Sequence, residues 1–492
     1  MARIAEILPG FLAWSTIILL FFASWKLPFY VAYFIVLFDL YWFLKTAYFY
    51  INFIIAYKKL RQTTLTNWMD KLQKEFQDKM NNIFHLVIFP MYKESYDVAK
   101  DSLEALLNVD YNKDKFIVVL ALEERGGEED QKVGIKLKQE FENKFFKFII
   151  TTHPKDIPGE LAGKGSNETF AIKQVKKEII DVYKIPYENI IVSSFDIDTI
   201  AAPQYFSLLT YKFLENNNGI HCSYQPIPLF ISNFKNTNLF SKIVGFTATF
   251  WQLMVQYGKT ETMTTFSSHS MPFKPLVDIN YWPVNVISED SQIFFKLKMY
   301  DAQWSITPLF YPIYMHAVDG QHLLEALKNI YKQQRRWAWG IENIVFIFKN
   351  LFNKTKMSLM QNLKWLLILL SGFYSWAMTS LIILVLGFLP IILGGNNFGH
   401  SVVAYNLPRI TGLLMNFASI GIIISAFFSI KILSNEKYKF NFKDKLIFFS
   451  GWILLPIILI LFGSFPALDA QTRMMLGGKF KLDFWKTPKY KK

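Results

Sequence analysis

The sequence predicts an α/β nucleotide-binding domain inserted between transmembrane helices, so that the whole chain forms a multi-pass membrane protein. The chain of 492 residues is 52% hydrophobic and contains 48 Phe, a composition that argues against a purely soluble protein. Uncharged runs long enough to cross a bilayer occur near both ends. Between them lies a mostly polar stretch in which short apolar runs alternate with helical patterns, as in folds built on a parallel sheet.

The hydrophobic runs predict the membrane frame, because a helix needs about 20 apolar residues to cross the hydrocarbon core. One candidate, residues 27–57, is apolar apart from Asp39 and Lys45. An ionisable group such as Asp39 is costly in lipid unless it faces protein or water, so either it marks a polar path or the span ends before it. The four runs without any charge are residues 7–25, 365–393, 410–430 and 446–468.

The distribution of basic residues predicts which side of the membrane the domain occupies. The loop 434–445 carries four Lys, whereas the loop 394–405 carries no Lys or Arg, so we expect the first loop and the central domain to be cytoplasmic. A count of three late spans would place residues 469–492 outside. Seven basic residues follow Gln471, and we therefore expect the tail to be cytoplasmic as well.

These patterns divide the chain into five parts. The central part is the α/β domain, and its flanks are membrane segments, an amphipathic stretch and a basic tail. The predicted boundaries are 1–57 for the N-terminal transmembrane helices, 58–319 for the α/β domain, 320–363 for amphipathic interfacial helices, 364–468 for the C-terminal transmembrane region and 469–492 for the tail.

Charge and cysteine content narrow the classes of partner. A net charge of +14 suits anionic lipid headgroups or a diphosphate substrate. We expect no nucleic acid partner, because the basic residues are spread along the chain without a known binding module. A single cysteine, Cys222, excludes an internal disulfide framework and a multi-cysteine zinc site.

The central part contains predicted strands whose ends should carry the chemistry. Apolar runs at 84–89, 116–121, 145–151 and 189–194 predict strands, and residues 96–107 predict a helix between the first two. In a largely parallel sheet the ligands bind beyond the carboxyl ends of the strands. Polar residues directly after strands are therefore the first candidates for a site.

Two carboxylates, Asp196 and Asp198, follow the last of these strands. Such a pair can hold a hard cation such as Mg²⁺ or Mn²⁺ and leave coordination positions for a pyrophosphate. The Asp-x-Asp pattern is common, however, and a solvated turn is the alternative interpretation. The pair therefore gains its significance from the residues around it.

A glycine-rich segment, Gly163-Lys164-Gly165-Ser166-Asn167, precedes a helical pattern upstream of the acids. Its ammonium group and backbone amides at a helix start would favour an anion. The spacing differs from that of a Walker loop, so nucleotide triphosphate hydrolysis is unsupported. A plain glycine-rich connection remains the alternative.

Downstream, Glu289 and Asp290 stand at the start of a predicted helix. Acids at that position often serve only as caps. The functional interpretation is that one of the two carboxylates accepts the proton of an attacking hydroxyl group.

A basic and aromatic pentapeptide, Gln333-Gln334-Arg335-Arg336-Trp337, lies inside the amphipathic stretch. Adjacent arginines and a tryptophan could neutralise a leaving diphosphate and stack on a sugar face. The alternative is an interfacial helix with lipid anchors.

Taken in order, these elements resemble the membrane-embedded family 2 glycosyltransferases, which include the cellulose, chitin and hyaluronan synthases. The resemblance rests on the Asp-x-Asp, the Glu-Asp pair and the pentapeptide Gln-Gln-Arg-Arg-Trp. The pentapeptide is similar to the family pattern Gln-(Gln/Arg)-x-Arg-Trp. The resemblance covers roughly residues 85–340. It implies a GT-A-like domain. The implied reaction is inverting, metal-dependent transfer of a sugar from a UDP- or GDP-linked donor to a growing polysaccharide, with possible translocation across the plasma membrane.

The resemblance also implies roles for individual residues. Asp290, with Glu289 beside it, would be the catalytic base, and Asp198 with Asp196 would bind Mg²⁺ or Mn²⁺. The implied substrate-binding residues are Glu123, Lys164, Asn167 and Asp196 for the donor, and Gln333, Gln334, Arg336 and Trp337 for the diphosphate and the acceptor sugar. Residues 90–94 resemble the nucleotide pocket of the family, and residues 265–271 occupy the place of its acceptor-facing loop.

Two segments of this chain depart from the family pattern. Relatives usually carry an Asp pair after the second strand, where this chain has Glu123 and Glu124. Residues 484–489 resemble the gating segment Phe-x-Val-Thr-x-Lys of cellulose synthases, with Lys486 in the place of Val. A lid role for this segment and a plain basic anchor both remain open.

Two other functions are compatible with parts of the sequence. One is non-processive transfer of a single sugar to a membrane lipid. The other, from a different class, is a transporter or channel with a cytoplasmic regulatory domain, which would leave the ordered acids and the pentapeptide without a purpose. The expected partners are therefore a nucleotide-sugar donor, a glycan or lipid acceptor, and membrane lipids.

Overall fold

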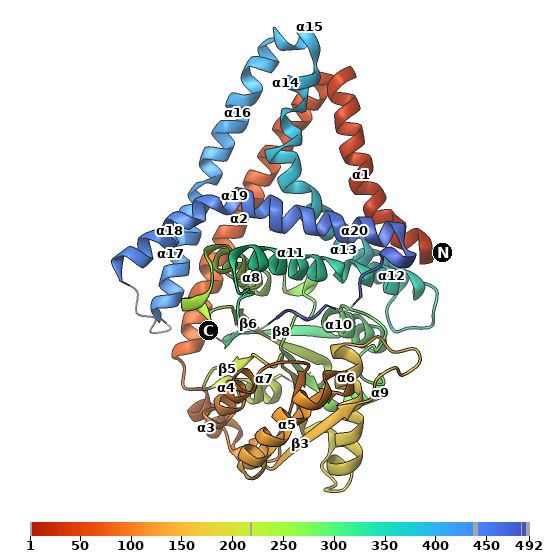
Figure 1. The fold of residues 1–492 in the computed structure, drawn as a ribbon, viewed down its shortest axis with the longest axis vertical. Helices are drawn as coiled ribbons and strands as arrows, with labels where there is room; N and C mark the ends of the chain where they lie inside the picture. The colour runs from red at the N-terminus through yellow and green to blue at the C-terminus, as the bar shows by residue number, and fades with distance from the viewer. Residues whose placement is uncertain (1, 217–218, 436–440, 484, 489–492) are drawn as a thin grey trace.

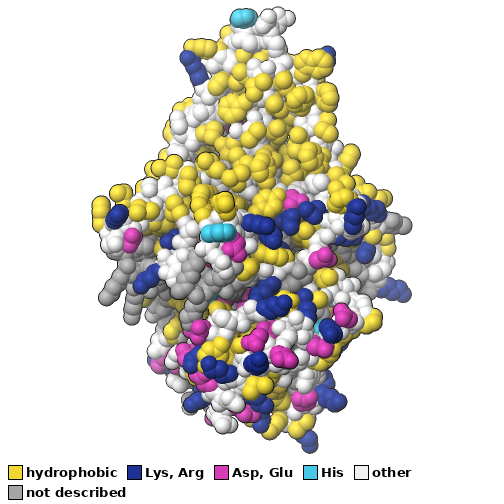
Figure 2. Space-filling model, viewed as in Figure 1, with side chains coloured by type: hydrophobic (Ala, Val, Ile, Leu, Met, Phe, Trp, Pro, Cys, Tyr) yellow, Lys and Arg dark blue, Asp and Glu magenta, His cyan; other side chains and the backbone are white. Residues whose placement is uncertain are grey.

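The computed structural model describes residues 2–216, 219–435, 441–483 and 485–488. Long helices converge at one end of the molecule, beside α15 (Gly395–Gly399), and the α/β domain forms the other end (Figure 1). Figure 2 shows hydrophobic side chains over the tapered end and most of the charged side chains over the broad end. The molecule is thus divided into a part suited to lipid and a part suited to water.

Apolar helices build the membrane frame. Their outer faces expose large side chains, such as Leu19 at 67% and Phe427 at 55%, which hydrocarbon accommodates and water does not. Within the described part of the chain, five helical stretches are long and apolar enough to cross a membrane. They are α1 (Ala2–Lys26), α2 (Pro28–Leu65), α13 (Leu359–Leu384), Val402–Asn435, which comprises α16 (Val402–Ala418) and α17 (Ile420–Asn435), and Phe442–Leu476.

The acidic residue of the second span lies in the packing between helices. Asp39 is only 5% exposed, and α2 packs against α16 along this part of the frame. The carboxyl group therefore faces protein, as expected for an ionisable residue inside a membrane segment.

The fifth apolar stretch takes a different course from the other four. Its helices α18 (Phe442–Gly451), α19 (Leu455–Ile458) and α20 (Phe465–Leu476) run across the long axis of the molecule rather than along it (Figure 1). Pro456 and Pro466 each stand in the first turn of a new helix, where a missing N–H is tolerated. This course brings the tail to the α/β domain, where Lys486 contacts Glu94.

An eight-stranded mixed sheet forms the centre of the α/β domain. The strands β3, β2, β1 and β4 are mutually parallel, whereas β7 pairs antiparallel with both β4 and β6. The strand order is β3 (Lys147–His153), β2 (Phe116–Glu123), β1 (Phe84–Met91), β4 (Ile190–Ser194), β7 (His269–Pro272), β6 (Cys222–Leu229), β8 (Ser305–Tyr314) and β5 (Ile200–Ala201).

The parallel half confirms the predicted strands and the helix between the first two. β2 is buried along its whole length and β1 along most of it, which explains why both appear as continuous apolar runs. Helices cover both faces, so each face has its own hydrophobic core. The covering helices include α3 (Trp68–Met80), α4 (Tyr96–Leu107), α5 (Gly127–Phe141), α6 (Lys164–Val175) and α7 (Tyr205–Glu215).

A layer of helices joins the sheet to the membrane frame. α8 (Leu239–Gly258), α11 (Leu323–Ala338) and α12 (Glu342–Lys349) lie between the two parts (Figure 1). Side chains of α2, α8 and α17 share one hydrophobic core. The domain is therefore packed onto the frame, and α11 lies next to it.

Candidate active site

The two acids after β4 lie at the centre of the candidate site. Asp198 is 1% exposed, and its Oδ2 accepts the backbone N–H of His316 at 2.9 Å, just beyond β8. The Oδ2 of Asp196 accepts the hydroxyl of Ser267. Both carboxylates are thus positioned at the junction between the parallel half of the sheet and β8.

Lys164 connects the acids after β4 with the acid on α10 (Glu289–Tyr300). It is the first residue of α6, and its Nζ lies 2.9 Å from Asp196 Oδ1 and 2.9 Å from Asp290 Oδ1. Three sequence elements that were predicted separately therefore meet at one ammonium group. We call Lys164, Glu168, Asp196, Glu289 and Asp290 the acid–lysine cluster.

Burial and charge strongly affect protonation inside this cluster. Burial alone would lower the pKa of Lys164, but the surrounding carboxylates, led by Asp196 and Asp290, outweigh it and raise the pKa well above its usual value. Burial raises the pKa of Glu168 to about 8, although Lys164 opposes the shift. Burial, with the adjacent Asp290 charge, raises the pKa of Glu289 well above its usual value. Lys164 is therefore charged at neutral pH, and the two buried glutamic acids favour the protonated form.

The start of α10 distinguishes the two interpretations of the Glu-Asp pair. Glu342 on α12 accepts the backbone N–H groups of Ile287 at 3.0 Å and Ser288 at 2.8 Å, and also the Ser288 hydroxyl. Asp290 contacts Lys164. The Glu342 bonds thus lie ahead of the helix, whereas Asp290 directs a carboxylate oxygen to Lys164 and so belongs to the cluster.

The loop before β7 borders the same cluster. Thr265 donates its hydroxyl to the backbone carbonyl of Asp290, and Ser268 accepts the Asp196 N–H at 3.3 Å. His269 is fully buried, its Nδ1 lies 4.0 Å from Asp290 Oδ1, and burial lowers its pKa to about 4. The segment expected to face the acceptor thus contacts both acids directly.

The pentapeptide lies on α11 between the cluster and the frame. Gln333 and Trp337 line a hollow together with Phe230 and residues of α8, and the Trp337 ring packs against Phe230 and Phe266. Gln334 is also buried, at 7% exposure. Arg336 is close enough to Glu289 to lower its pKa in opposition to burial. These predicted residues therefore occupy the side of the site that faces the frame.

One arginine of the pentapeptide has a different role. Arg335 Nη1 lies 2.8 Å from Asp469 on α20, and Tyr331 donates its hydroxyl to the same carboxylate at 3.2 Å. Asp469 also pairs with Arg473 at 2.6 Å. Arg335 thus joins α11 to the helix that lies across the frame.

The predicted nucleotide side is formed by the ends of β1 and β2. Glu123 is 4% exposed and pairs with Arg125, whose guanidinium lies 4.2 Å above the Tyr92 ring. Asn167 is fully buried, and its amide donates to the Ala121 carbonyl at 2.7 Å. Glu123 therefore borders an aromatic and charged surface, whereas Asn167 is directed into the domain, toward β2.

The tail reaches this nucleotide side. Lys486 Nζ lies 3.0 Å from Glu94 Oε1, directly after β1, and Thr487 is 5% exposed. Lys332 of α11 lies 5.2 Å from the Trp485 ring. Of the segment that resembles the gating pattern, Phe484 and Lys489 lie outside the described residues.

Some residues of the site were not predicted from the sequence. Glu168 follows Lys164 by one helical turn, so its position on the same face of α6 was a usable signal. Arg125 and Glu342 gave no comparable signal. The position of Arg125 above the Tyr92 ring and the contact of Glu342 with the start of α10 depend on tertiary packing.

Comparison with known families identifies the class of protein. A family model described as glycosyl transferase family group 2 matches residues 191–462, which is more than half of the chain. The chain belongs to this family and is a membrane glycosyltransferase with a mixed α/β sheet of the GT-A type.

Individual relatives are more distant. No curated protein matches the chain. Among solved structures it is similar to a mannosyltransferase from Pyrobaculum calidifontis in complex with GDP-mannose and Mn²⁺, with 12% identity, 90% of this chain and 99% of that chain covered, and a TM-score of 0.42. It is also similar to TarS 1–349 from S. aureus in complex with UDP-GlcNAc, with 15% identity, 69% and 90% covered, and a TM-score of 0.38.

Proposed function

We propose that this glycosyltransferase transfers a sugar, with inversion, from a UDP- or GDP-linked donor to a growing polysaccharide at the cytoplasmic face of the plasma membrane. The observation that carries the proposal is the acid–lysine cluster, in which Lys164 lies 2.9 Å from both Asp196 and Asp290. The predicted diphosphate-binding and base residues are thereby brought to one point. The cluster lies beside α11, next to the frame through which a polymer would leave.

A divalent cation suits the chemistry of the proposed donor site. Asp196 and Asp198 supply carboxylate oxygens, which Mg²⁺ and Mn²⁺ prefer. No group of three or more side chains suited to metal binding occurs in the described part of the chain. We therefore propose that Asp198, with Asp196, holds the cation together with oxygens of the donor diphosphate. When bound, the cation would offset the negative charge of the leaving diphosphate.

In the proposed reaction Asp290 acts as the base. Its carboxylate accepts the proton of the acceptor hydroxyl while that oxygen forms a bond to the anomeric carbon. The bond from this carbon to the diphosphate oxygen breaks, and the diphosphate leaves with the bonding electron pair. Lys164 and Arg336 lie on the cluster side of the site and would stabilise that charge.

The donor and acceptor are proposed to enter from opposite sides of the cluster. The nucleotide would lie against Tyr92, Glu123 and Arg125, at the ends of β1 and β2. The acceptor sugar would lie in the hollow that Gln333 and Trp337 line, because an indole ring and amide groups suit a sugar face. Asn167 would act indirectly, by holding the start of α6 against β2.

A second acceptor fits the same geometry. α11 lies at the boundary between the domain and the frame (Figure 1), so the headgroup of a membrane lipid could also present a hydroxyl to Asp290. This alternative is transfer of a single sugar without a polymer. It shares the donor, the metal and the base with the main proposal and differs in the product.

One experiment distinguishes these products. Membranes enriched in the protein would be incubated with labelled UDP- and GDP-sugars and with Mg²⁺ or Mn²⁺, and the labelled product would be sized. A long polymer supports the main proposal, and a single sugar on extractable lipid supports the alternative. Label release without either product, at a rate unchanged in Asp290→Asn, would contradict both.

A further inference from the structure

A pocket outside the candidate active site contains an arginine, Arg61, that has no charged partner among the described residues. It lies where α2, α17, β6 and β8 meet, and its hollow measures about 250 Å³ with its open mouth included. We call it the Arg61 pocket. It is lined by Tyr57, Leu60, Arg61, Thr64, Leu229, Pro312, Ile432 and Asn435.

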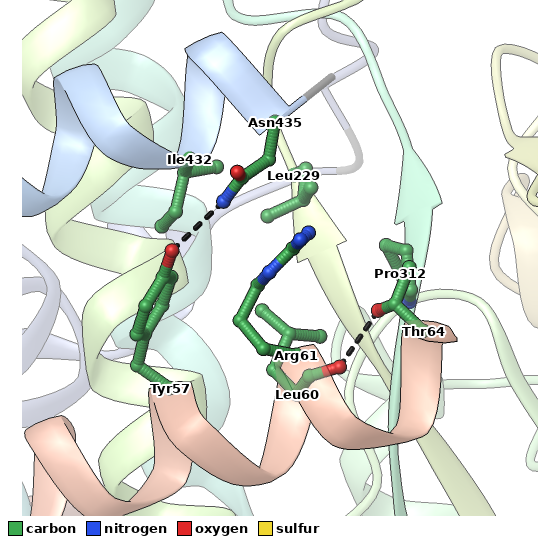
Figure 3. A pocket seen from close by; sticks show the side chains of 8 residues that line it. All are labelled: Tyr57, Leu60, Arg61, Thr64, Leu229, Pro312, Ile432 and Asn435. Carbon is green, nitrogen blue, oxygen red and sulfur yellow. Dashed lines mark hydrogen bonds between the residues drawn. The ribbon is translucent and has the colours of Figure 1, made fainter. Parts of the chain in front are cut away.

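Figure 3 shows the Arg61 guanidinium directed from α2 into this space, between Asn435 and Leu229. Arg61 is half-buried. Among the described residues it makes no hydrogen bond and no ion pair, and the lining contains no Asp or Glu. A guanidinium carries five N–H donors in a planar fork, and leaving them without acceptors beside apolar walls is unfavourable.

The other polar groups of the pocket add to the case for an anion. Asn435 donates its amide to the Tyr57 hydroxyl at 2.8 Å (Figure 3), which keeps both side chains at the rim. Thr64 is held by its own helix, because its hydroxyl donates to the Leu60 carbonyl at 2.7 Å. Lys431 lies 5.5 Å from the Tyr57 ring and adds a second positive charge nearby. Hydrogen bonds thus hold the polar side chains of the rim, and Lys431 adds to the positive charge around them.

We propose that the Arg61 pocket binds a phosphate group, which the guanidinium would contact through two parallel N–H donors. The group belongs either to an anionic lipid headgroup or to free phosphate. The lipid source agrees with the setting, because α17 also exposes the large apolar side chains Ile423 and Phe427 a few turns before Asn435. This site is separate from the acid–lysine cluster and does not depend on the proposed reaction.

The test compares ligand binding by purified protein in zwitterionic nanodiscs. One arm adds phosphatidylglycerol or phosphatidylcholine, and the other adds inorganic phosphate or chloride at equal ionic strength. Binding is followed by the shift in melting temperature and by lipid retained in native mass spectrometry, since a ligand of the folded state raises the melting temperature. Stabilisation by phosphatidylglycerol alone assigns the lipid source, and stabilisation by inorganic phosphate assigns the free anion.

Three variants test whether any observed binding occurs in the Arg61 pocket. Arg61→Gln removes the charge, and Asn435→Asp places a competing carboxylate at the rim. We expect both to bind about tenfold more weakly. Lys58→Gln removes an exposed charge one turn earlier on α2 and should bind like the wild type. If Arg61→Gln and Asn435→Asp bind as the wild type does, or if no phosphate compound stabilises the wild type, the proposal is overturned.

Discussion

The charges of the acid–lysine cluster do not balance. One ammonium, Lys164, lies among four carboxyl groups, of which Asp196 and Asp290 contact it at 2.9 Å. The raised pKa values of Glu168 and Glu289 reduce the excess negative charge by favouring their protonated forms. The remaining pair, Asp196 and Asp290, then exceeds the single lysine by one negative charge. A divalent cation entering with the donor diphosphate would offset this excess.

The proposed base gives the first prediction. Asp290→Asn keeps the shape of the side chain and loses the ability to accept a proton. We expect transfer to fall by about 10²-fold or more, while donor binding is largely preserved. Nucleotide titration and turnover on one preparation would measure both. A variant that retains more than about a tenth of the wild-type rate would exclude a base role for Asp290.

The second prediction concerns the metal. Asp198→Ala should weaken donor binding chiefly in the presence of Mg²⁺ or Mn²⁺, because the carboxylate would act through the cation. Donor affinity is compared with and without chelator for the variant and the wild type. Equal losses in the two conditions would instead assign Asp198 a structural role, through its contact with the His316 backbone.

The third prediction follows from Glu168. Burial raises its pKa to about 8, against 4.5 for an unperturbed group. The folded protein therefore holds a proton that the unfolded chain releases, and the free energy of unfolding falls as pH rises from about 4.5 to about 8. Glu168→Gln does not titrate and still offers an oxygen to Ser194.

We expect the melting temperature of the wild type to fall more between about pH 5 and pH 8 than that of Glu168→Gln. Glu178→Gln, which removes an exposed acid in the turn after α6, serves as the control and should follow the wild type. Parallel pH profiles for all three proteins would show that Glu168 does not hold this proton.

At the scale of elements, the tail is the segment whose sequence and structure differ most from expectation. The family pattern has Val where this chain has Lys486, which left the lid role in doubt. Lys486 instead forms an ion pair with Glu94, at the turn that resembles the nucleotide pocket. The replacement of Val therefore provides a polar contact between the tail and the proposed donor side.

The fourth prediction tests that contact. Removing residues 484–492, or changing Lys486→Ala, should lower transfer or raise the ratio of donor hydrolysis to transfer, because a lid that closes over the donor excludes water. The Lys479→Ala control removes an exposed charge from the same tail. An unchanged rate and ratio in the deletion would leave the tail as a basic anchor only.

The sequence was sufficient for some elements and insufficient for others. β1, β2, β4 and α4 are local patterns, since buried parallel strands appear as apolar runs and α4 has a 3.6-residue period. The other half of the sheet, β7, β6, β8 and β5, in which parallel and antiparallel pairs are mixed, was not predicted. β7 has only four residues, and β5 only two, so their pairing is decided by tertiary contacts rather than by propensity.

The same distinction holds for the candidate site. The Asp-x-Asp, Glu-Asp and pentapeptide elements could be found as motifs, and the structure brings Asp196 and Asp290 to a common lysine. A partner such as Glu342, which bonds the start of α10, depends on how distant segments pack. The sequence also did not separate the role of Arg335, which pairs with Asp469, from that of its neighbour Arg336.

At the scale of the whole molecule, the course of residues 442–476 decides where the tail lies. By length and composition this stretch could cross a membrane. It runs across the other helices (Figure 1). Asp469 on this stretch pairs with Arg335 and so holds it to α11. We propose that it lies at the cytoplasmic interface, so that the α/β domain and the tail share one side.

The fifth prediction tests this arrangement with single cysteines. The native Cys222 is 1% exposed and should give little background. A membrane-impermeant thiol reagent added to intact cells should label Asn397→Cys, in α15, and should leave Lys479→Cys unlabelled until the membrane is opened. Labelling of Lys479→Cys in intact cells would mean that residues 442–476 cross the bilayer, and the tail could not then reach the donor side.

The contact between α1 and α20 has a consequence for biosynthesis. Arg3 donates to the carbonyl of Met474 at 3.1 Å and to that of Leu476 at 2.9 Å, and Glu6 pairs with Lys481 at 2.6 Å. These partners are separated by 471 residues or more. At about 5–20 residues per second, the first helix waits roughly half a minute to a minute and a half for its partner to leave the ribosome. The tail that follows α20 is made later still. In a nascent chain whose α/β domain has already folded, the proposed donor site would therefore remain open to water until synthesis is nearly complete.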